Sequence, residues 1–265
     1  MNKNHFLALA ILCLAMLGLT GCLSAELKSM GTYPMPVAHQ PRIAPDSKEV
    51  ENVVSADGFT LFNQGWSNTE KIYGGGGFLS AIHRMNGWLS PMFASVTVGG
   101  YGGNLNFACD YDEDCSEEYL AWLKTSGDRY DISFWAIQER FMAGFEFNTP
   151  INVFLGFGGG VLMYQSGGEY DDARKDLDRK FRKIYNKGGA IDAFLLGSIW
   201  LGYHIGKNAK YGSISVDLDI SNAYLSNYVL STPINIGYFH PSGFHGGIGA
   251  NSYGIDIFFG KSFKF

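Results

Sequence analysis

The sequence YGIDIFFGKSFKF, from Tyr253 to Phe265, alternates between two kinds of side chain. Its odd positions carry tyrosine, isoleucine and phenylalanine, interrupted by Lys261, and its even positions carry mostly glycine and polar residues, among them Asp256. An alternation with a period of two is typical of a β-strand that has one apolar face. We therefore predict a strand over 251–265, with its apolar face against lipid and Asp256 on the opposite, inner face.

Other segments show a similar alternation, most clearly from Tyr211 to Ser221. Several run for about 11 to 16 residues, whereas the mean strand has about 5–6 residues and a tilted transmembrane strand needs about 9–11. In one of them the apolar parity changes near Ala136, as either a β-bulge or a division into two elements would produce. The eight predicted strands cover 52–63, 71–83, 91–107, 129–147, 151–165, 189–206, 210–221 and 251–265.

The connections between these strands alternate in length after the first one. They are short after the second, fourth and sixth strands and long after the third, fifth and seventh, over 108–128, 166–188 and 222–250. Short turns on one side and long loops on the other are typical of outer-membrane barrels. An even number of strands would place both ends of the barrel domain, and with them the N-terminal anchor, on the periplasmic side.

The composition agrees with a β-rich chain and excludes one class of function. Charged residues make up 17% of the 265 residues, below the usual level of about 25%, and 35 residues are glycine. The net charge of −5 gives no basic footprint for nucleic acid, so no nucleic-acid partner is expected. The fold class predicted is all-β, with a single barrel domain over 51–265.

The N-terminus has the features of a secretion signal. Lys3 precedes an apolar run from Phe6 to Leu19, which is too short to span a bilayer as a helix. The sequence Leu19-Thr20-Gly21-Cys22 follows and resembles the lipobox of bacterial lipoproteins. That resemblance implies a signal peptide over 1–21 and acylation of Cys22, with palmitate among the acyl chains. Residues 22–50 contain four prolines and are predicted to be a flexible linker.

Over roughly 52–265 the chain resembles the small eight-stranded outer-membrane barrels of the OmpA/OmpX type. The resemblance rests on strand alternation, strand count, loop asymmetry and the terminal phenylalanine, and it implies an up-and-down barrel in the bacterial outer membrane. Side chains fill the interior of an eight-stranded barrel, and buried carboxylates need partners. We therefore predict a network of paired charges in the lumen, formed by Arg140, Glu146, Asp192, His204, Asp217, Asp219 and Asp256.

The two cysteines that remain after Cys13 and Cys22 lie close together in a polar loop. In an exported protein this spacing predicts a disulfide between Cys109 and Cys115, with free thiols or a metal pair as the alternatives. Between them, Asp110, Asp112 and Asp114 resemble the start of a calcium loop. The glycine and glutamate that such a loop requires are absent, so a solvated acidic loop is favoured. No metal and no cofactor is expected.

Two further motifs carry alternative functions. Residues 170–187 predict a short amphipathic helix in an outer loop, whose i,i+4 charge pairs support it. Its basic side chains would contact lipopolysaccharide phosphates if the helix binds lipid, namely Arg174, Arg179, Lys180, Arg182 and Lys183. The sequence His240-Pro241-Ser242 has the H-x-S spacing of outer-membrane lipid A deacylases, but its Pro and Gly243 indicate a turn.

The favoured function is therefore a non-enzymatic barrel lipoprotein with a structural or surface-interaction role. Its partners would be membrane lipid, at the acyl anchor and the outer barrel face, and a surface partner or lipopolysaccharide at the loops. The alternative is a lipid-tethered periplasmic barrel of lipocalin type. In that case the apolar strand faces would line a cavity for an apolar ligand, and the polar faces would meet water.

Overall fold

The computed structural model describes residues 33–42, 49–62, 70–107, 117, 121, 132–176, 191–221, 233–251 and 254–265. They contain ten strands: β1 (Glu51–Phe62), β2 (Glu70–Arg84), β3 (Met92–Phe107), β4 (Ile132–Asn148), β5 (Val153–Gly167), β6 (Asp192–His204), β7 (Ser213–Ser221), β8 (Ile234–Phe239), β9 (Phe244–Asn251) and β10 (Gly254–Lys264).

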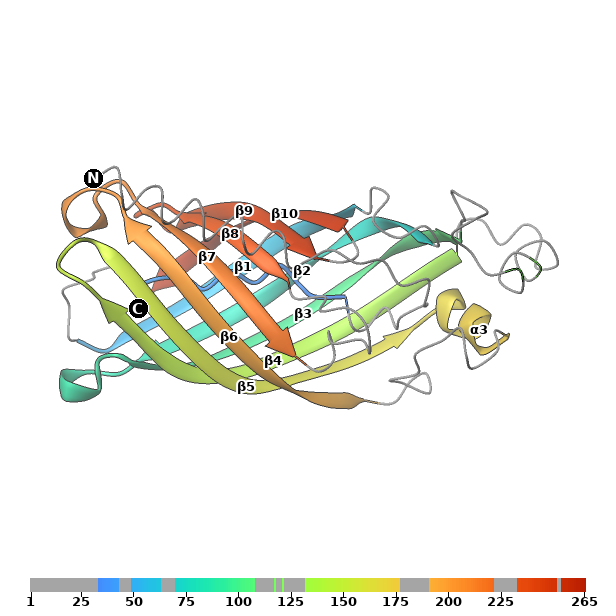
Figure 1. The fold of residues 1–265 in the computed structure, drawn as a ribbon, viewed down its shortest axis with the longest axis horizontal. Helices are drawn as coiled ribbons and strands as arrows, with labels where there is room; N and C mark the ends of the chain where they lie inside the picture. The colour runs from blue at the N-terminus through green and yellow to red at the C-terminus, as the bar shows by residue number, and fades with distance from the viewer. Residues whose placement is uncertain are drawn as a thin grey trace.

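All ten strands join in one closed antiparallel barrel. Each strand pairs with its neighbours in the sequence, and β1 pairs with β10 to close the ring, with Phe59 opposite Phe258 and Leu61 opposite Asp256. Figure 1 shows the strands inclined to the long axis of the molecule. Because successive strands are adjacent, the topology is up-and-down, as the resemblance to small outer-membrane barrels implies.

The number of strands differs from the predicted eight. The two additional strands, β8 and β9, lie within 222–250, which the sequence analysis assigns to a long outer loop. Both are short, with six and eight residues, and β9 (FHGGIGAN) carries three glycines, so each offers only a few alternating apolar positions. Their pairing depends on the neighbouring strands rather than on local propensity, with Ile236 opposite Ile248 and Gly237 opposite Gly247.

The connections divide the barrel into two ends. At one end, the turn end, lie the starting residues of β1, the final residues of β10 and the short connections β2–β3, β4–β5, β6–β7 and β8–β9. Two of these contain single 3-10 turns, η2 (Gly87–Leu89) and η5 (Lys207–Ala209). At the other end, the loop end, lie the remaining connections, including the helix α3 (Glu169–Asp176).

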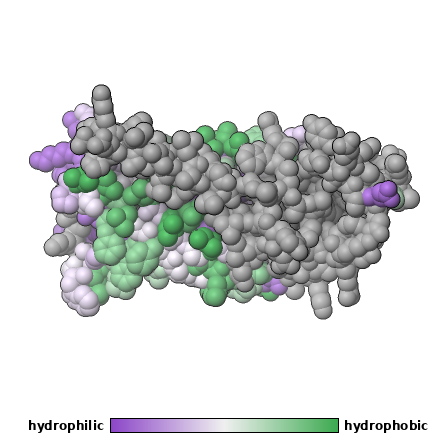
Figure 2. All heavy atoms as spheres, in the orientation of Figure 1, coloured by the Kyte–Doolittle hydropathy of each residue, from purple (hydrophilic) through white to green (hydrophobic). Residues whose placement is uncertain are grey.

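The strands separate an apolar outer face from a mixed inner face. In β10, Ile255, Ile257, Phe259 and Phe263 are about half or more exposed, whereas Asp256 is 1% exposed. The same parity continues around the barrel, and Figure 2 shows the resulting apolar band across the described strands. Outward-facing members of the band include Leu79, Val98, Phe141, Phe147, Leu155, Phe157, Ile199, Ile220, Ile236 and Ile248.

Strand β4 shows why its sequence appears to change phase near Ala136. The strand is continuous, and Ile132, Phe134, Gln138 and Arg140 all face the interior. The inner face is apolar toward the loop end and polar toward the turn end. The change of parity therefore reflects a change in the chemistry of the lumen, and neither a β-bulge nor a division into two elements is needed to explain it.

Residues 33–42 run inside the barrel and are called the lumen segment below. Tyr33 and Met35 are each 1% exposed, and His39, Gln40 and Arg42 are also buried. Figure 1 shows the segment as a blue trace along the interior. The sequence analysis places these residues in a flexible linker, and the structure differs over this range because the barrel wall surrounds them. Among the described residues, no helix has both the length and the apolar character that a membrane-crossing helix needs.

Candidate functional site: the lumen and its internal segment

The loop-end half of the lumen is an apolar cluster around the start of the lumen segment. Tyr33 packs against Tyr101 with ring centroids 5.9 Å apart, and Phe59 lies 6.0 Å from the rings of both Tyr101 and Phe78. Aromatic rings in tilted and edge-to-face contact stabilise a core beyond the area that they bury. The other buried members of the cluster are Met35, Leu61, Ile72, Leu105, Ile132, Phe134, Ala136, Tyr170 and Phe258.

Hydrogen bonds fix the first residue of the lumen segment within this cluster. The Tyr33 hydroxyl donates to Asp256, which also accepts a bond from Asn251 Nδ2 at 3.1 Å. The Tyr33 carbonyl accepts bonds from the Tyr101 hydroxyl at 2.9 Å and from the Gln138 amide. Side chains of three strands, β3, β4 and β10, thus bond a single residue of the segment.

Inward-facing glycines make room for the segment along its length. A Cβ atom on Gly99 would lie 2.4 Å from Met35 Sδ, and one on Gly249 would lie 3.0 Å from the Cβ atom of Pro36. A Cβ atom on Gly237 would lie 3.1 Å from the Cβ atom of Ala38. These distances are close to or below the limit of real Cβ contacts, so the wall is shaped to accept this segment.

The turn-end half of the lumen is polar, and His39 connects the segment to it. His39 Nε2 lies 2.6 Å from Glu146 Oε2, and the backbone N–H of Arg42 donates to Glu146 Oε1 at 3.1 Å. The His39 ring also stacks on Trp200, with centroids 3.9 Å apart and planes at 17°. Glu146 therefore accepts two bonds from the segment, and Trp200 covers the opposite side of the imidazole.

Arg84 is the centre of the ion pairs at the turn end. It is 1% exposed, lies 2.9 Å from Glu51 and 3.7 Å from Glu146, and donates to the Gln40 carbonyl of the segment. A buried guanidinium requires this number of partners because its desolvation is costly. Lys264 approaches Glu51 at 3.6 Å from the surface.

A second ion pair lies nearer the middle of the barrel. Arg140 donates to both carboxylate oxygens of Asp219, at 2.8 and 3.1 Å, and the Ser198 hydroxyl adds a third bond to Asp219 at 2.6 Å. Ser215 donates to Asp217 at 2.7 Å on the same inward face of β7. The paired groups come from β4, β6 and β7, so the network ties distant strands together.

The residues of the predicted charge network thus do not form one network. Arg140 meets Asp219, and Glu146 meets Arg84 and the lumen segment, whereas Asp217 and Asp256 contact polar uncharged side chains. His204 lies at the turn end of β6, bonded to Ser213 at 2.8 Å and Asn148 at 2.9 Å. Asp192 begins β6 at the loop end and is only partly buried.

Several residues of the lumen were not expected from the sequence. Glu51 and Arg84 face each other across β1 and β2. Their positions have inward parity, which could have indicated that they are luminal. However, β1 carries both apolar and polar residues on that face. For residues 33–42 the sequence has no strand pattern at all. The lumen residues not predicted are His39, Arg42, Glu51, Asp57, Arg84 and His245.

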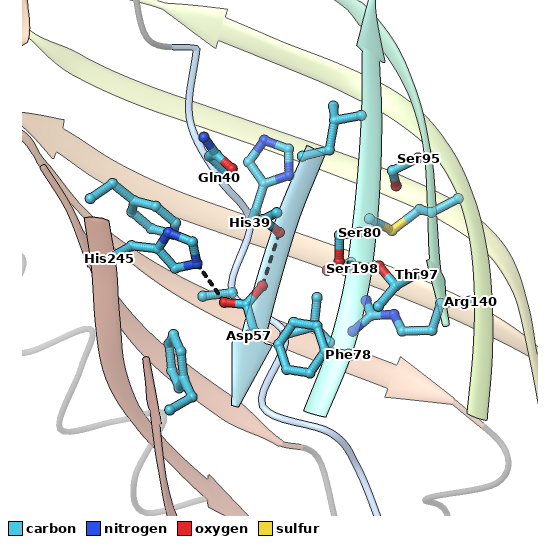
Figure 3. A pocket seen from close by; sticks show the side chains of 17 residues that line it. His39, Gln40, Asp57, Phe78, Ser80, Ser95, Thr97, Arg140, Ser198 and His245 are labelled. Atoms are coloured by element: carbon cyan, nitrogen blue, oxygen red, sulfur yellow. Dashed lines mark hydrogen bonds and ion pairs between the residues drawn. The ribbon is translucent and has the colours of Figure 1, made fainter. Parts of the chain in front are cut away.

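Asp57, His245 and Ser262 form a set that resembles a catalytic triad in composition. Figure 3 shows His245 against Asp57, and His245 Nδ1 lies 3.2 Å from Ser262 Oγ. However, Nδ1 also lies 3.1 Å from the Gly243 carbonyl, which can only accept a hydrogen bond. Nδ1 therefore carries a proton and cannot remove one from Ser262, whose hydroxyl donates to Gln40 Oε1 at 2.8 Å. The arrangement is an ion pair that supports the segment.

The His240-Pro241-Ser242 sequence lies in the β8–β9 turn at the turn end. His240 Nδ1 is 2.7 Å from Ser242 Oγ, and both side chains are exposed. The described contacts of His240 are with Ser242 and the Tyr238 ring. A turn position differs from the strand context that the deacylase motif requires, and it agrees with the turn that Pro241 and Gly243 predict.

Helix α3 covers the loop end of β4. Glu169 at its start accepts bonds from the Ser133 backbone N–H and hydroxyl, both at 3.0 Å, and these two bonds hold the pKa of Glu169 below its ordinary value. Tyr170, the second residue of the helix, is fully buried and belongs to the apolar cluster of the lumen. The helix thus packs on the barrel rim, and Arg174 lies within it.

The other predicted sites lie outside the described residues. These are Cys22, Cys109, Cys115, the aspartates 110, 112 and 114, and the basic residues Arg179, Lys180, Arg182 and Lys183. Among the residues that the structure does describe, no group of three or more His, Cys, Asp or Glu side chains is placed to hold a metal ion.

The lumen is closed by its own side chains and by the lumen segment. A cavity of about 40 Å³ remains between the segment and the wall, lined in part by His39, Asp57, Arg140 and His245 (Figure 3). A second space of about 90 Å³ lies at the turn end beside Pro41 and Lys210. Both are small compared with pockets for drug-sized ligands, which occupy about 300–1,000 Å³.

Neither the protein-family models nor the curated protein sequences contain a match to this chain. Among solved structures it is similar to Neisserial surface protein A, with TM-score 0.35, 12% identity and coverage of 83% of this chain and 98% of that chain. It is similar to the outer membrane protein OprG of Pseudomonas aeruginosa, with TM-score 0.35, 9% identity and coverage of 82% and 97%.

A third similar structure is Ail, the attachment invasion locus protein of Yersinia pestis, with TM-score 0.32, 9% identity and coverage of 82% and 97%. At TM-scores this low, no property of these proteins is transferred to this chain. The strand pairing of the chain itself establishes the closed antiparallel barrel.

Proposed function

We propose that the chain is a non-enzymatic, membrane-spanning barrel lipoprotein of the bacterial outer membrane, whose lumen is closed by its own residues 33–42. The observation that carries this proposal is the parity of the strands. Apolar side chains face outward around the barrel, whereas Glu51, Arg84, Arg140 and Asp219 are buried and face inward, where they form ion pairs. In lipid, only a barrel with no open edge satisfies every backbone group, and this barrel is closed.

The turn end has the chemistry of a membrane–water interface. Trp88 is 88% exposed there, and Tyr211 and Phe244 are also exposed. Lys261 lies over the Phe244 ring at 4.5 Å, so its ammonium group reaches past the apolar band toward the headgroups. Aromatic girdles and lysines that extend to the interface are typical of barrels that span membranes.

The lipocalin-type alternative requires the opposite arrangement. It needs polar side chains on the outside and an apolar cavity within, whereas here the outer face is apolar and the lumen is filled. The cavity of about 40 Å³ leaves no room for an apolar ligand of lipid size.

The geometry of the polar groups supports a structural role for them rather than catalysis. Both ring nitrogens of His245 face acceptors, and His240 and Ser242 lie in an exposed turn. Any recognition of a surface partner or of lipopolysaccharide would then fall to the loop end, where α3 exposes Glu169 and Asp172. Acylation at Cys22 and a disulfide between Cys109 and Cys115 complete the proposal.

Removal of the anchor tests this function. A Cys22→Ser variant, exported with an ordinary cleavable signal, should stay in the membrane after carbonate extraction and should run differently on gels before and after heating. Release into the soluble fraction without a gel shift would show that the chain is a tethered soluble barrel. The wild-type lipoprotein, treated in parallel, is the control.

A further inference from the structure

The lumen segment has a defined direction. Its first residue, Tyr33, bonds to Asp256, which lies near the loop end of β10. Its last residue, Arg42, donates to the Met85 carbonyl at 3.3 Å and the Ser90 carbonyl at 3.0 Å, both in the β2–β3 connection at the turn end. The chain therefore travels from the loop side to the turn end before it enters β1 (Figure 1).

This direction limits where the residues before Tyr33 can go. Among the described residues, packed side chains surround the segment, and the two spaces beside it, of about 40 and 90 Å³, are too small for a second length of peptide. The preceding residues therefore have no route back along the lumen to the turn end.

A route along the outside of the barrel is also unfavourable. It would pass through the hydrocarbon beside the apolar outer face, where backbone N–H and C=O groups of an unpaired chain have no hydrogen-bond partners. The strands cannot supply partners, because the barrel is closed and its neighbouring strands already pair with each other.

We infer that the chain N-terminal to Tyr33 leaves the lumen at the loop end, so that the acylated Cys22 inserts into the leaflet on the loop side. The inference rests on the proposed function, which supplies both the membrane-spanning barrel and the acylation. Ten residues lie between Cys22 and Tyr33, and the eleven residue-to-residue steps reach at most about 36–40 Å when fully extended. This is the leaflet opposite to the one that the sequence analysis predicts.

The arrangement gives the loop end a second attachment to lipid. The barrel wall meets the membrane along its apolar face, and the acyl chains would hold the same molecule from the outer surface. The lumen segment connects the two, since Tyr33, His39 and Arg42 bond it to the wall at successive levels.

Site-specific labelling in cells tests the inference. In a Cys109→Ser, Cys115→Ser background, single cysteines replace Lys28, Asp172 and Lys210 in the full-length lipoprotein. Asp172 is exposed in α3 at the loop end, and Lys210 is exposed at the turn end. A membrane-impermeant maleimide is added to intact cells and to cells with a permeabilised outer membrane, and a heat-dependent gel shift confirms that each barrel is folded.

The inference predicts that residue 28 has the same labelling pattern as residue 172 in intact and permeabilised cells, and a different pattern from residue 210. A residue 28 with the pattern of residue 210 would overturn it. The inference would also be overturned if residue 28 labelled in neither intact nor permeabilised cells but labelled after the protein was denatured. If residues 172 and 210 label equally in intact cells, the barrel has no sidedness, and the proposed membrane-spanning function fails with the inference.

Discussion

At the scale of single residues, the lumen depends on a few charges that are each paired. Arg140 and Asp219 are both at least 95% buried and share two hydrogen bonds, with Ser198 as a third partner of the carboxylate. The sequence predicted both residues as luminal because they lie on the polar parity of their strands. It could not predict which charge meets which, because that depends on the register between β4 and strands farther around the ring.

We predict that Arg140→Met destabilises the barrel by about 3–5 kcal/mol, because it leaves the Asp219 carboxylate buried without its counter-ion. The midpoint of urea unfolding, monitored by the heat-dependent gel shift, measures this loss of stability. The double variant Arg140→Met, Asp219→Leu is the control and should recover most of the loss. Equal stability of Arg140→Met and the wild type would show that the pair is not buried in the folded protein.

A second residue-scale prediction concerns Glu169. Its folded-state pKa is lowered by the two bonds from Ser133. A lowered pKa means that the bonds stabilise α3 at pH values above the unfolded pKa, and that this stabilisation is lost as the pH falls through the folded pKa.

An NMR titration of Glu169 in nanodiscs should therefore give a midpoint below the ordinary glutamate value of about 4.3. Ser133→Ala removes one of the two bonds and should move the midpoint part of the way back. A midpoint at the ordinary value in the wild type would contradict the contact between α3 and β4.

At the scale of elements, the long strands were predictable and the two short ones, β8 and β9, were not. The ranges of β2, β3, β5 and β10 agree with the predictions to within a few residues, and these strands have 11 to 16 residues each. β8 and β9 were missed because they have only six and eight residues and contain glycines. Gly237 and Gly249 in these strands instead leave space for the lumen segment.

We predict that Gly249→Val disturbs the lumen segment, because a Cβ atom there would lie 3.0 Å from Pro36 and 2.8 Å from Asn235 Oδ1. Gly246→Val is the matched control, since Gly246 is on the outer face of the same strand. The atom nearest to a Cβ atom on Gly246 would be the Phe258 carbonyl oxygen, at 3.0 Å. Limited proteolysis in detergent should cut the N-terminal region faster in Gly249→Val than in Gly246→Val. The same cutting rate in both variants would show that the segment does not pack against Gly249.

At the scale of the whole molecule, an apolar outer wall surrounds a lumen that contains the protein's own residues 33–42. The sequence predicted the closed barrel and its apolar face, since both follow from a period of two. It predicted a linker where the structure places the lumen segment, because Tyr33, Met35 and His39 have no periodic pattern. Their burial depends on surroundings that only the closed barrel creates, so no local signal could have shown it.

The central claim is that the odd positions of β10 face lipid and the even positions face a closed lumen. Spin labels placed singly at residues 255 to 260, in protein reconstituted into bilayers, measure this through relaxation by oxygen and by a water-soluble nickel complex. The account predicts that Ile255, Ile257 and Phe259 are accessible to oxygen and shielded from nickel, and that Asp256 and Phe258 are shielded from both. Nickel access at the odd positions would contradict the membrane-spanning barrel.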